Sequence, residues 1–507
     1  MNIFEAKQEI KNTLKIYLNK NEFGEYTISR VRQRPILLIG APGLGKTAIM
    51  AQIAKEVGVG LVSYSITHHT RQSAIGLPFI TDRKYGDECY KITEYTMSEI
   101  IASVYETMEK TGKREGILFI DEINCASETL APTMLQFLQL KQFGQHKVPD
   151  GWVVVAAGNP PEYNKSVKEF DTVTLDRIKL VAVEADYKVW KKYAYEYNVH
   201  NAIISYLDIN ENNFYKVEST VEGKEIVTAR GWDDLSQVIT MYEQLNIKIK
   251  KSLVLQYIQH KDVAAHFTNF YELYNKYKND YNFDDILAGV LNTADRDKIM
   301  RASFDEKLSF LSMLLEKVAS LMNACMRDET VTELLYNYLK QLREFYQSED
   351  YSYTSVLDYC GEAENIITQN IANGTIDKKE VQNYKSALAL LKKFTENANT
   401  ASGEDGFKAF EKIREYFSQR ANQEEKHAQE VNASLDNAFK FISSIFGLGQ
   451  ELIIFVTELT YNYHSIRFLA EHPNASYLRY NKELLFDQKE KALIQDMTKL
   501  EEMVKEL

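Results

Sequence analysis

The stretch GAPGLGKT, from Gly40 to Thr47, decides the fold of the first part of the chain. An apolar run, Pro35–Ile39, precedes it, and a segment with helical spacing, Thr47–Val57, follows it. A strand, a glycine-rich loop and a helix in this order are the context of a phosphate-binding P-loop. The alternative is a chance match to the P-loop motif in a glycine-containing turn. A chance match would not be expected to lie between a strand and a helix.

The residue types in this loop suit a nucleoside triphosphate. Gly40 and Gly45 let backbone N–H groups turn inward around phosphates, and the helix N-terminus adds partial positive charge. We expect Lys46 to reach the β- and γ-phosphates and the Thr47 hydroxyl to ligate Mg²⁺. The predicted ATP-binding residues are Gly40, Ala41, Pro42, Gly43, Leu44, Gly45, Lys46 and Thr47.

Polar residues follow two later apolar runs. Asp121 and Glu122 come directly after Ile117–Ile120. We expect Asp121 to hold Mg²⁺ and Glu122 to polarise the attacking water as general base. Asn159 follows the run Trp152–Ala157 and could hydrogen-bond the γ-phosphate and the lytic water. An ordinary Asn-Pro turn after a strand is the structural alternative for Asn159.

Two arginines are candidates for neutralising phosphate charge. Arg177 stands in the segment TLDRI and Arg230 in the segment TARGW. One of them would act across a subunit boundary as an arginine finger, and the other would act from a lid. Most arginines are only solvated or salt-bridged, which is the alternative for both residues.

The predicted fold is an α/β P-loop core with a parallel sheet, followed by a helical lid and an all-α module. Strands without apolar–polar alternation indicate a sheet covered on both faces. Two hairpins interrupt this pattern, one at Leu77–Thr81 with Cys89–Thr93 and one at Gln142–Pro149. The predicted domains are residues 1–186 for the core, 187–276 for the lid, and 277–507 for a helical domain of unassigned role.

Helical periodicity dominates the last domain. The predicted helices are Phe304–Met326, Thr332–Tyr346, Lys379–Asn397, Gly406–Asn432 and Leu435–Leu469. Breaks are predicted at Ser348–Tyr353, Asn373–Gly374 and Ala398–Asp405. The apolar stretch Phe439–Tyr463 is predicted to be a buried core helix, and a groove for a partner helix is the alternative.

The composition of the chain bears on its cellular compartment and on the kinds of molecule that it binds. The chain has 507 residues, with Lys+Arg 60, Asp+Glu 72 and a net charge of −12, a balance that does not favour nucleic acid or anionic membranes. The N-terminus does not read as a signal peptide, and the most apolar segment, Leu452–Val456, is too short to span a bilayer. We therefore expect a soluble, cytoplasmic protein without membrane insertion.

No metal site is expected from the spacing of cysteines or histidines. Cys89, Cys125, Cys325 and Cys360 form no C-x-x-C pair and have no histidine close by in the sequence. We expect them to be reduced thiols in the core or at the surface. The histidines His68, His69 and His146 are interpreted as polar loop residues rather than metal ligands.

Together these motifs resemble AAA+ ATPases of the MoxR type, over about residues 30–245. The matching segments are GAPGLGKT, ILFIDEIN with Asn124, AAGNPPE, TLDRI and TARGW. The resemblance accounts for both hairpins, one inserted in the second helix and one before the sensor-1 strand. By matching positions it implies Walker A residues Lys46 and Thr47, Walker B residues Asp121 and Glu122, sensor-1 Asn159, arginine finger Arg177 and sensor-2 Arg230.

The resemblance also implies a ring, usually a hexamer, with ATP and Mg²⁺ as cofactors and a chaperone-like role on a client protein. A von Willebrand factor A domain protein is a common partner, and because this sequence has no D-x-S-x-S motif, such a partner would be another chain. A nucleic-acid motor is the alternative, but the first hairpin combines Arg83 and Lys84 with acidic residues, and the second is only mildly basic. A nucleotide switch with little turnover is a third hypothesis, and it has no need of a general base.

Overall fold

The computed structural model describes residues 1–68, 72, 74, 76–86, 88–163, 170, 172–220, 223–290, 293–346, 353–372, 378–402 and 405–484. The chain forms two compact units. One contains Met1–Trp190, Asn212–Leu235 and Leu255–Lys261, and the other contains Lys191–Glu211, Ser236–Val254 and Asp262–Leu507. This division passes through the segment 187–276 that the sequence predicts as a lid.

The first unit is built on a five-stranded parallel sheet with the strand order β2-β5-β8-β1-β9. The strands are β1 (Ile36–Gly40), β2 (Gly60–Ser65), β5 (Gly116–Asp121), β8 (Trp152–Gly158) and β9 (Lys179–Val183). β1 lies between β8 and β9, and Ile39 is in register with Gly158. The loops that follow β1, β5 and β8 therefore leave the same edge of the sheet. The predicted parallel sheet is confirmed.

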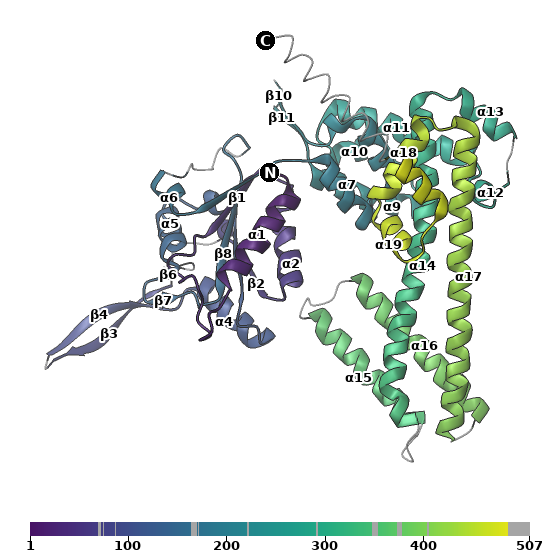
Figure 1. The fold of residues 1–507 in the computed structure, drawn as a ribbon. Coiled ribbons are helices and arrows are strands. Elements are labelled where there is room, and N and C mark those ends of the chain that lie inside the picture. Colours follow the sequence, from purple (N-terminus) through teal and green to yellow (C-terminus); the bar gives the residue numbers. More distant parts are fainter. Residues whose placement is uncertain are drawn as a thin grey trace, which may run out of the picture. The chain divides into compact units, whose positions relative to one another are not determined.

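Helices cover both faces of this sheet (Figure 1). α1 (Ile3–Tyr17) and α2 (Lys46–Val57) pack on one face, and α4 (Glu99–Thr111) and α5 (Ala131–Leu140) pack on the other. Neighbouring residues of a strand enter opposite cores, as when Leu38 packs with α1 and α2 while Leu37 packs with α4 and α5. Burial on both sides explains why the strands read as continuous apolar runs.

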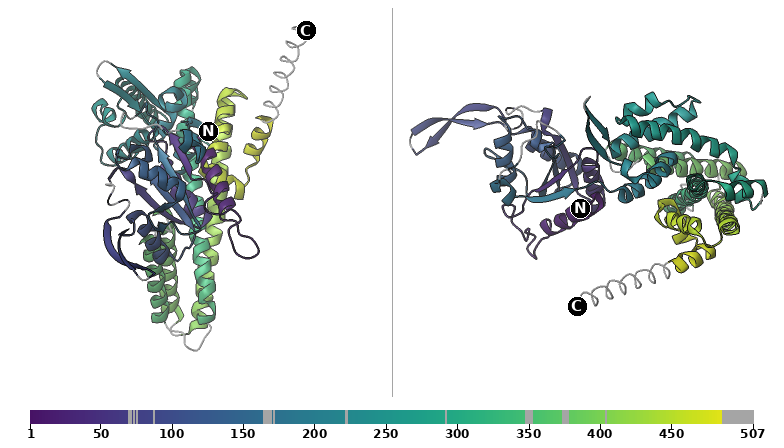
Figure 2. Two further views of the ribbon diagram at one scale, coloured as in Figure 1. Left: turned by 90° about the vertical axis from the view of Figure 1, so that its left-hand side faces the viewer. Right: turned by 90° about the horizontal axis from the view of Figure 1, so that it is seen from above.

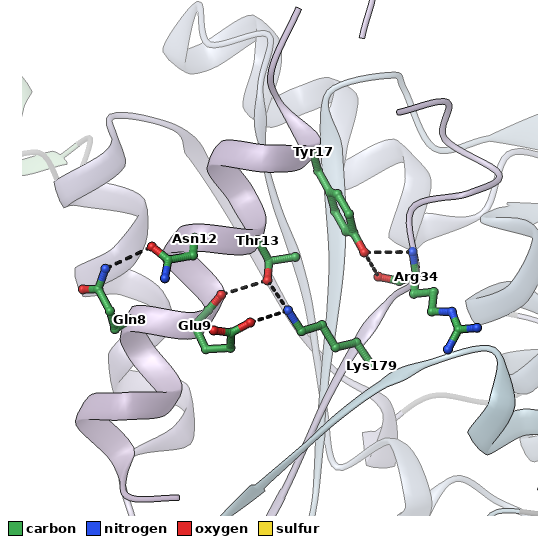
Figure 3. Close-up of polar contacts among 7 residues, drawn as sticks. All are labelled: Gln8, Glu9, Asn12, Thr13, Tyr17, Arg34 and Lys179. Carbon is green, nitrogen blue, oxygen red and sulfur yellow. Dashed lines mark hydrogen bonds and ion pairs between the residues drawn. The ribbon is translucent and has the colours of Figure 1, made fainter. Parts of the chain in front are cut away.

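α1 is fixed to the edge strand β9 and to the segment that leads into β1 (Figure 3). The Lys179 ammonium lies 2.5 Å from the Glu9 carboxylate and donates to the Thr13 hydroxyl at 2.7 Å. The Tyr17 hydroxyl accepts the Arg34 N–H at 3.1 Å. Since the Lys179 and Glu9 side chains are partly exposed, the ion pair contributes at most about 1 kcal/mol, and apolar burial does most of the fixing.

Two hairpins extend from the first unit where the sequence predicts them. β3 (Pro78–Tyr85) pairs with β4 (Glu88–Tyr95) as an antiparallel ribbon that projects away from the sheet (Figures 1 and 2). The strands are longer than predicted. β6 (Gln142–Phe143) and β7 (His146–Lys147) form the second, much shorter hairpin. Asp87, between these two strands, lies outside the described residues.

A third hairpin and a long helix lie between β9 and residue 250. β10 (Lys216–Thr220) pairs with β11 (Gly223–Val227) as an antiparallel hairpin. α9 (Ala229–Gln244) begins two residues after this hairpin ends. Short helices around them include α7 (Tyr187–Glu196), α8 (Asn201–Ile209) and α10 (Lys251–Tyr257).

The second unit is helical, and two of its helices are longer than predicted. α14 (Phe304–Tyr346) is one continuous helix, not two helices with a break after Met326, because residues 327–331 contain no glycine or proline and include good helix formers. α17 (Gly406–Phe446) likewise continues through the break predicted at 433–434. It ends at Gly447, whose φ of 62° suits glycine, so Leu435–Leu469 is not one helix.

Other helix boundaries in this unit also differ from the prediction. α15 (Tyr353–Ala372) was not predicted, and α16 (Lys378–Ser402) extends into the break expected at Ala398–Asp405. Residues 348–352 and 373–374, where two breaks are predicted, lie outside the described residues. The other helices are α11 (Lys261–Asp280), α12 (Phe283–Leu287), α13 (Thr293–Arg301), α18 (Gln450–Tyr461) and α19 (Tyr463–Glu471).

α14, α15, α16 and α17 share an apolar core. Its buried side chains include Leu335, Cys360, Leu388, Leu391, Ala409 and Ile413. By length and composition the Phe304–Arg343 part of α14 could cross a membrane, although 56% of its apolar window is buried within the protein. That share is typical of a core helix in a bundle. The helix that comes nearest to the length and composition of a membrane span is therefore α14, and not the short segment Leu452–Val456 named from the sequence.

Replacing Gly116 with alanine should destabilise the first unit. A Cβ at this position would lie 2.5 Å from the ring of buried Trp152, its partner across the β5–β8 ladder. We expect a loss of about 1–3 kcal/mol from overpacking, measured as an earlier unfolding transition. Gly361→Ala in α15 is the control, because a Cβ there meets no atom within 4 Å. Equal stability of the two variants would contradict the packing argument.

Candidate nucleotide-binding site

The P-loop connects the end of β1 to the first residue of α2. Gly43 and Gly45 have φ values of 78° and 84°, a region that glycine adopts without the strain of a side chain. Gly43 also lies against the start of α9, since a Cβ there would be 3.2 Å from Thr228 Cβ and 3.4 Å from Arg230 Cβ. The loop is therefore shaped by its glycines and is in contact with the residues that begin α9.

Lys46, the first residue of α2, places a buried cation against the loop. Its side-chain ammonium donates to Gly40 O at 2.7 Å, to Ala41 O at 2.8 Å and to Asn159 Oδ1 at 2.9 Å. Burial lowers the pKa of Lys46 to about 8, and the positive charge of Arg230 acts in the same direction. A buried cation with only partial neutralisation has electrostatic affinity for an anion, as a phosphate cradle requires.

Thr47 and Asp121 supply the oxygen ligands that Mg²⁺ prefers. The Thr47 hydroxyl donates to Asp121 Oδ2 at 2.6 Å, and Asp121 Oδ1 accepts the Glu122 N–H at 2.9 Å. β5 and α2 bring these two side chains together from distant parts of the chain. A hydroxyl beside a carboxylate fits Mg²⁺, which is usually held by one or two carboxylates with water and substrate phosphates completing its shell.

Glu122 adopts a backbone conformation that is uncommon for a residue with a side chain. Its φ is 55° and its ψ is 34°. Such a conformation costs on the order of 1 kcal/mol and persists only where the surrounding structure imposes it. Its carboxylate accepts a hydrogen bond from the Thr67 hydroxyl at 3.0 Å. Thr67 follows β2 in a single 3₁₀ turn, η1 (Ile66–His68), and restrains the predicted general base.

Asn159 is held in place by the Walker B segment. Asn124 Nδ2 donates to the carbonyl of Asn159 at 2.7 Å. This contact requires glycine at position 158, where a Cβ would lie 2.5 Å from Asn124 Oδ1. With its backbone held in this way, Asn159 directs its side-chain oxygen to Lys46. Asn159 thus lies in the same cluster as the loop lysine, as its position after β8 predicts.

The two arginines have different positions. Arg230 lies at the start of α9 beside Gly43, close enough for its charge to act on Lys46. Arg177 is exposed just after α6 (Thr172–Asp176) and donates to Gln139 near the end of α5. The structure therefore brings Arg230 to the P-loop but does not bring Arg177 there within the described chain. The predicted role of Arg177 on a neighbouring subunit stays a prediction.

Two residues at this site were missed from the sequence. Thr67 is one, although its position at the end of β2, next to β5 in the sheet, is a usable signal once the strand order is known. Tyr215 is the other, and its hydroxyl donates to Pro42 O at 3.2 Å. Burial raises the pKa of Tyr215, so the phenol stays a donor at neutral pH. Tyr215 precedes β10 and has no motif around it.

Thr67→Val should slow ATP turnover without weakening ATP binding. Valine keeps the shape of threonine but cannot donate to the Glu122 carboxylate, so the base would lose its orientation. We expect turnover to fall about tenfold or more, with ATP affinity within about twofold of wild type. Thr67→Ser, which keeps the hydroxyl, should retain most of the activity. Equal rates for the valine variant and wild type would show that Thr67 does not position Glu122.

A comparison with protein families agrees with the assignment of a nucleotide-binding site. The family model described as "ATPase family associated with various cellular activities (AAA)" matches residues 36–173. This range begins at β1 and contains the P-loop, Asp121, Glu122 and Asn159. No curated protein matches the chain. Residues 36–173 are therefore an AAA domain, and the chain carries a P-loop NTPase core of the ATPase type.

Proposed function

We propose that the chain is a MoxR-type AAA+ ATPase that works in the cytoplasm as a ring, most simply a hexamer, and remodels or activates a client protein. The observation that carries this proposal is the convergence of Lys46, Thr47, Asp121, Glu122 and Asn159 at one edge of the sheet. A site with both a phosphate-binding lysine and a positioned carboxylate base is suited to hydrolysis. A nucleotide switch with little turnover would not need the restrained Glu122.

Hydrolysis at this site would depend on positioning and charge. Lys46 would pair with the β- and γ-phosphates, exchanging its hydrogen bonds to Gly40 O, Ala41 O and Asn159 Oδ1 for phosphate oxygens. Thr47 and Asp121 would hold Mg²⁺, which neutralises developing phosphate charge. Glu122, oriented by Thr67, would accept the proton of the attacking water, and Asn159 would hydrogen-bond that water or the γ-phosphate.

The hairpin of β3 and β4 supports a protein client over nucleic acid. Its exposed side chains include large apolar ones, which suit contact with a partly unfolded chain: Phe79, Ile80, Tyr85 and Tyr90. Its described charges are mixed: Asp82, Arg83, Lys84, Glu88, Lys91 and Glu94. Arg83 lies 3.7 Å from Glu94, so part of this charge is internally paired. A strand-tracking motor would need a clearly basic surface instead.

The partner proposal rests on the resemblance to MoxR-type ATPases. A von Willebrand factor A domain protein on another chain would supply the metal-dependent adhesion site that this sequence lacks. A pull-down from native lysate tests the client class, with the Glu122→Gln protein held in its ATP state. Recovery of a metal-site adhesion-type protein would favour the chaperone role, and nuclease-sensitive recovery would favour the nucleic-acid alternative.

Glu122→Gln should bind ATP and hydrolyse it at least about a hundredfold more slowly, because glutamine cannot accept the proton of the attacking water. ATP binding is measured by calorimetry and turnover by phosphate release. Lys46→Ala is the matched variant and should lose ATP binding itself. Wild-type turnover in the glutamine variant would remove Glu122 from the base role, and unchanged ATP affinity in the alanine variant would reject the P-loop assignment.

Arg177→Ala alone should hydrolyse ATP poorly, yet mixing it with Glu122→Gln protein should restore part of the turnover. In a mixed ring some sites would combine an intact Glu122 with Arg177 from the neighbouring subunit. The rescue is measured as phosphate release against mixing ratio, with each variant alone as the control. Absence of any rescue would argue against an arginine finger that acts in trans.

A further inference from the structure

Three side chains with metal-binding atoms meet in the helical unit, far from the nucleotide site in sequence. Cys325 and Glu329 lie one turn apart on α14, and His472 follows α19. The Cys325 thiol, a Glu329 carboxylate oxygen and a His472 ring nitrogen all lie within 4.8 Å of one another. Cys325 Sγ is 3.8 Å from Glu329 Oε1, and His472 Nε2 is 2.6 Å from the same oxygen.

This finding corrects the sequence-based expectation that the cysteines have no histidine partner. The spacing rule examined neighbours along the chain, whereas His472 is brought to Cys325 only by the packing of α19 on α14. The sequence does contain one indication of this cluster. Cys325 and Glu329 are four residues apart, which places both on one face of a helix.

The histidine is held in position by its own segment. The backbone N–H of His472 donates to Phe468 O at 2.8 Å, and the centroids of the His472 and Phe468 rings lie 4.9 Å apart. Two residues later, buried Asn474 donates to Asp436 Oδ1 of α17 at 3.1 Å. Cys325 and Glu329 are both presented by α14, whose side chains pack into a buried core. A preformed arrangement of this kind lowers the cost of binding a ligand.

The charges around the cluster favour a cation. Cys325 is buried, and the negative charges of Glu329, Asp328 and Glu424 act on its thiol. Arg420 lies 3.0 Å from Glu424 and is paired with it. A thiol in such surroundings is a poor nucleophile, which argues against a Cys–His catalytic pair. A bound divalent cation reverses this balance, because coordination removes the thiol proton and draws on the surrounding negative charge.

We propose that Cys325, Glu329 and His472 form a binding site for Zn²⁺ within the helical unit. One sulfur, one nitrogen and one carboxylate oxygen form a donor set that suits this ion, and water would complete a tetrahedral shell. In such a shell the ligand atoms lie about 3.2–3.7 Å apart. The Sγ–Oε1 distance is already close to that range, and the His472–Glu329 pair opens slightly when the ion replaces their hydrogen bond.

An ion could enter the proposed site from solvent, and its role there would be structural. Cys325 is buried, but the Glu329 and His472 side chains are 22% and 26% exposed, so the site opens to solvent on the carboxylate and imidazole side. Binding would link α14 to the segment that leaves α19. The site is independent of the proposed ATPase activity, and it would stabilise the helical unit with or without nucleotide.

Co²⁺ titration of the full-length, reduced protein tests the proposal, because a thiolate ligand gives an intense charge-transfer band in the near ultraviolet. The Thr47–Asp121 pair offers only oxygen and gives no such band. We expect a band that saturates at a single ion per chain, is bleached by Zn²⁺, and is lost in Cys325→Ser. Zn²⁺ should also raise the melting temperature of the wild-type protein but not of this variant.

Cys360→Ser is the matched control, since Cys360 is also a buried thiol of the helical unit but lies outside the cluster. It should keep the band. His472→Gln, at a partly exposed position, should weaken Zn²⁺ binding at least about tenfold and serves if the serine variant fails to fold. A band that survives both Cys325→Ser and His472→Gln, or the absence of a saturable band in wild type, would overturn the proposal.

Discussion

The structure of the first unit depends on one constraint: parallel strands place all their carboxyl ends at the same edge of a sheet. β1 lies between β8 and β9, and β5 lies beside β8, so the loops after β1, β5 and β8 open side by side. The P-loop follows β1, the carboxylates of Asp121 and Glu122 lie at the end of β5, and Asn159 follows β8. Their side chains meet because strand order brings them together, although long stretches of chain separate them.

The hydrogen bonds at that edge form one connected network. Lys46 joins the P-loop to Asn159, and Asn124 joins Asn159 to the segment after β5. Thr47 closes the network by donating to Asp121. Each contact restrains the next, so the protein itself orders the side chains of the site. Such preorganisation is the main protein contribution to phosphoryl transfer.

Most of the fold and the centre of the site follow from the sequence, for reasons that particular residues make clear. The apolar runs before Gly40, Asp121 and Asn159 predict the strands. The P-loop motif predicts that the phosphate site lies at the ends of these strands. Long helices were predicted less well, because polar residues inside α14 resemble a break when their neighbours are unknown. Thr67 and Tyr215 depend on tertiary contacts that no local pattern encodes, and the meeting of Cys325 with His472 has the same cause.

The burial of Lys46 links nucleotide binding to the uptake of protons. Its pKa is lowered to about 8 by burial, so above that pH a growing share of the protein without nucleotide carries a neutral amine. Phosphate oxygens beside the amine favour its charged form and raise its pKa again. Above about pH 8, binding of a polyphosphate therefore absorbs a proton from the solvent, and the measured heat of binding depends on the ionisation enthalpy of the buffer.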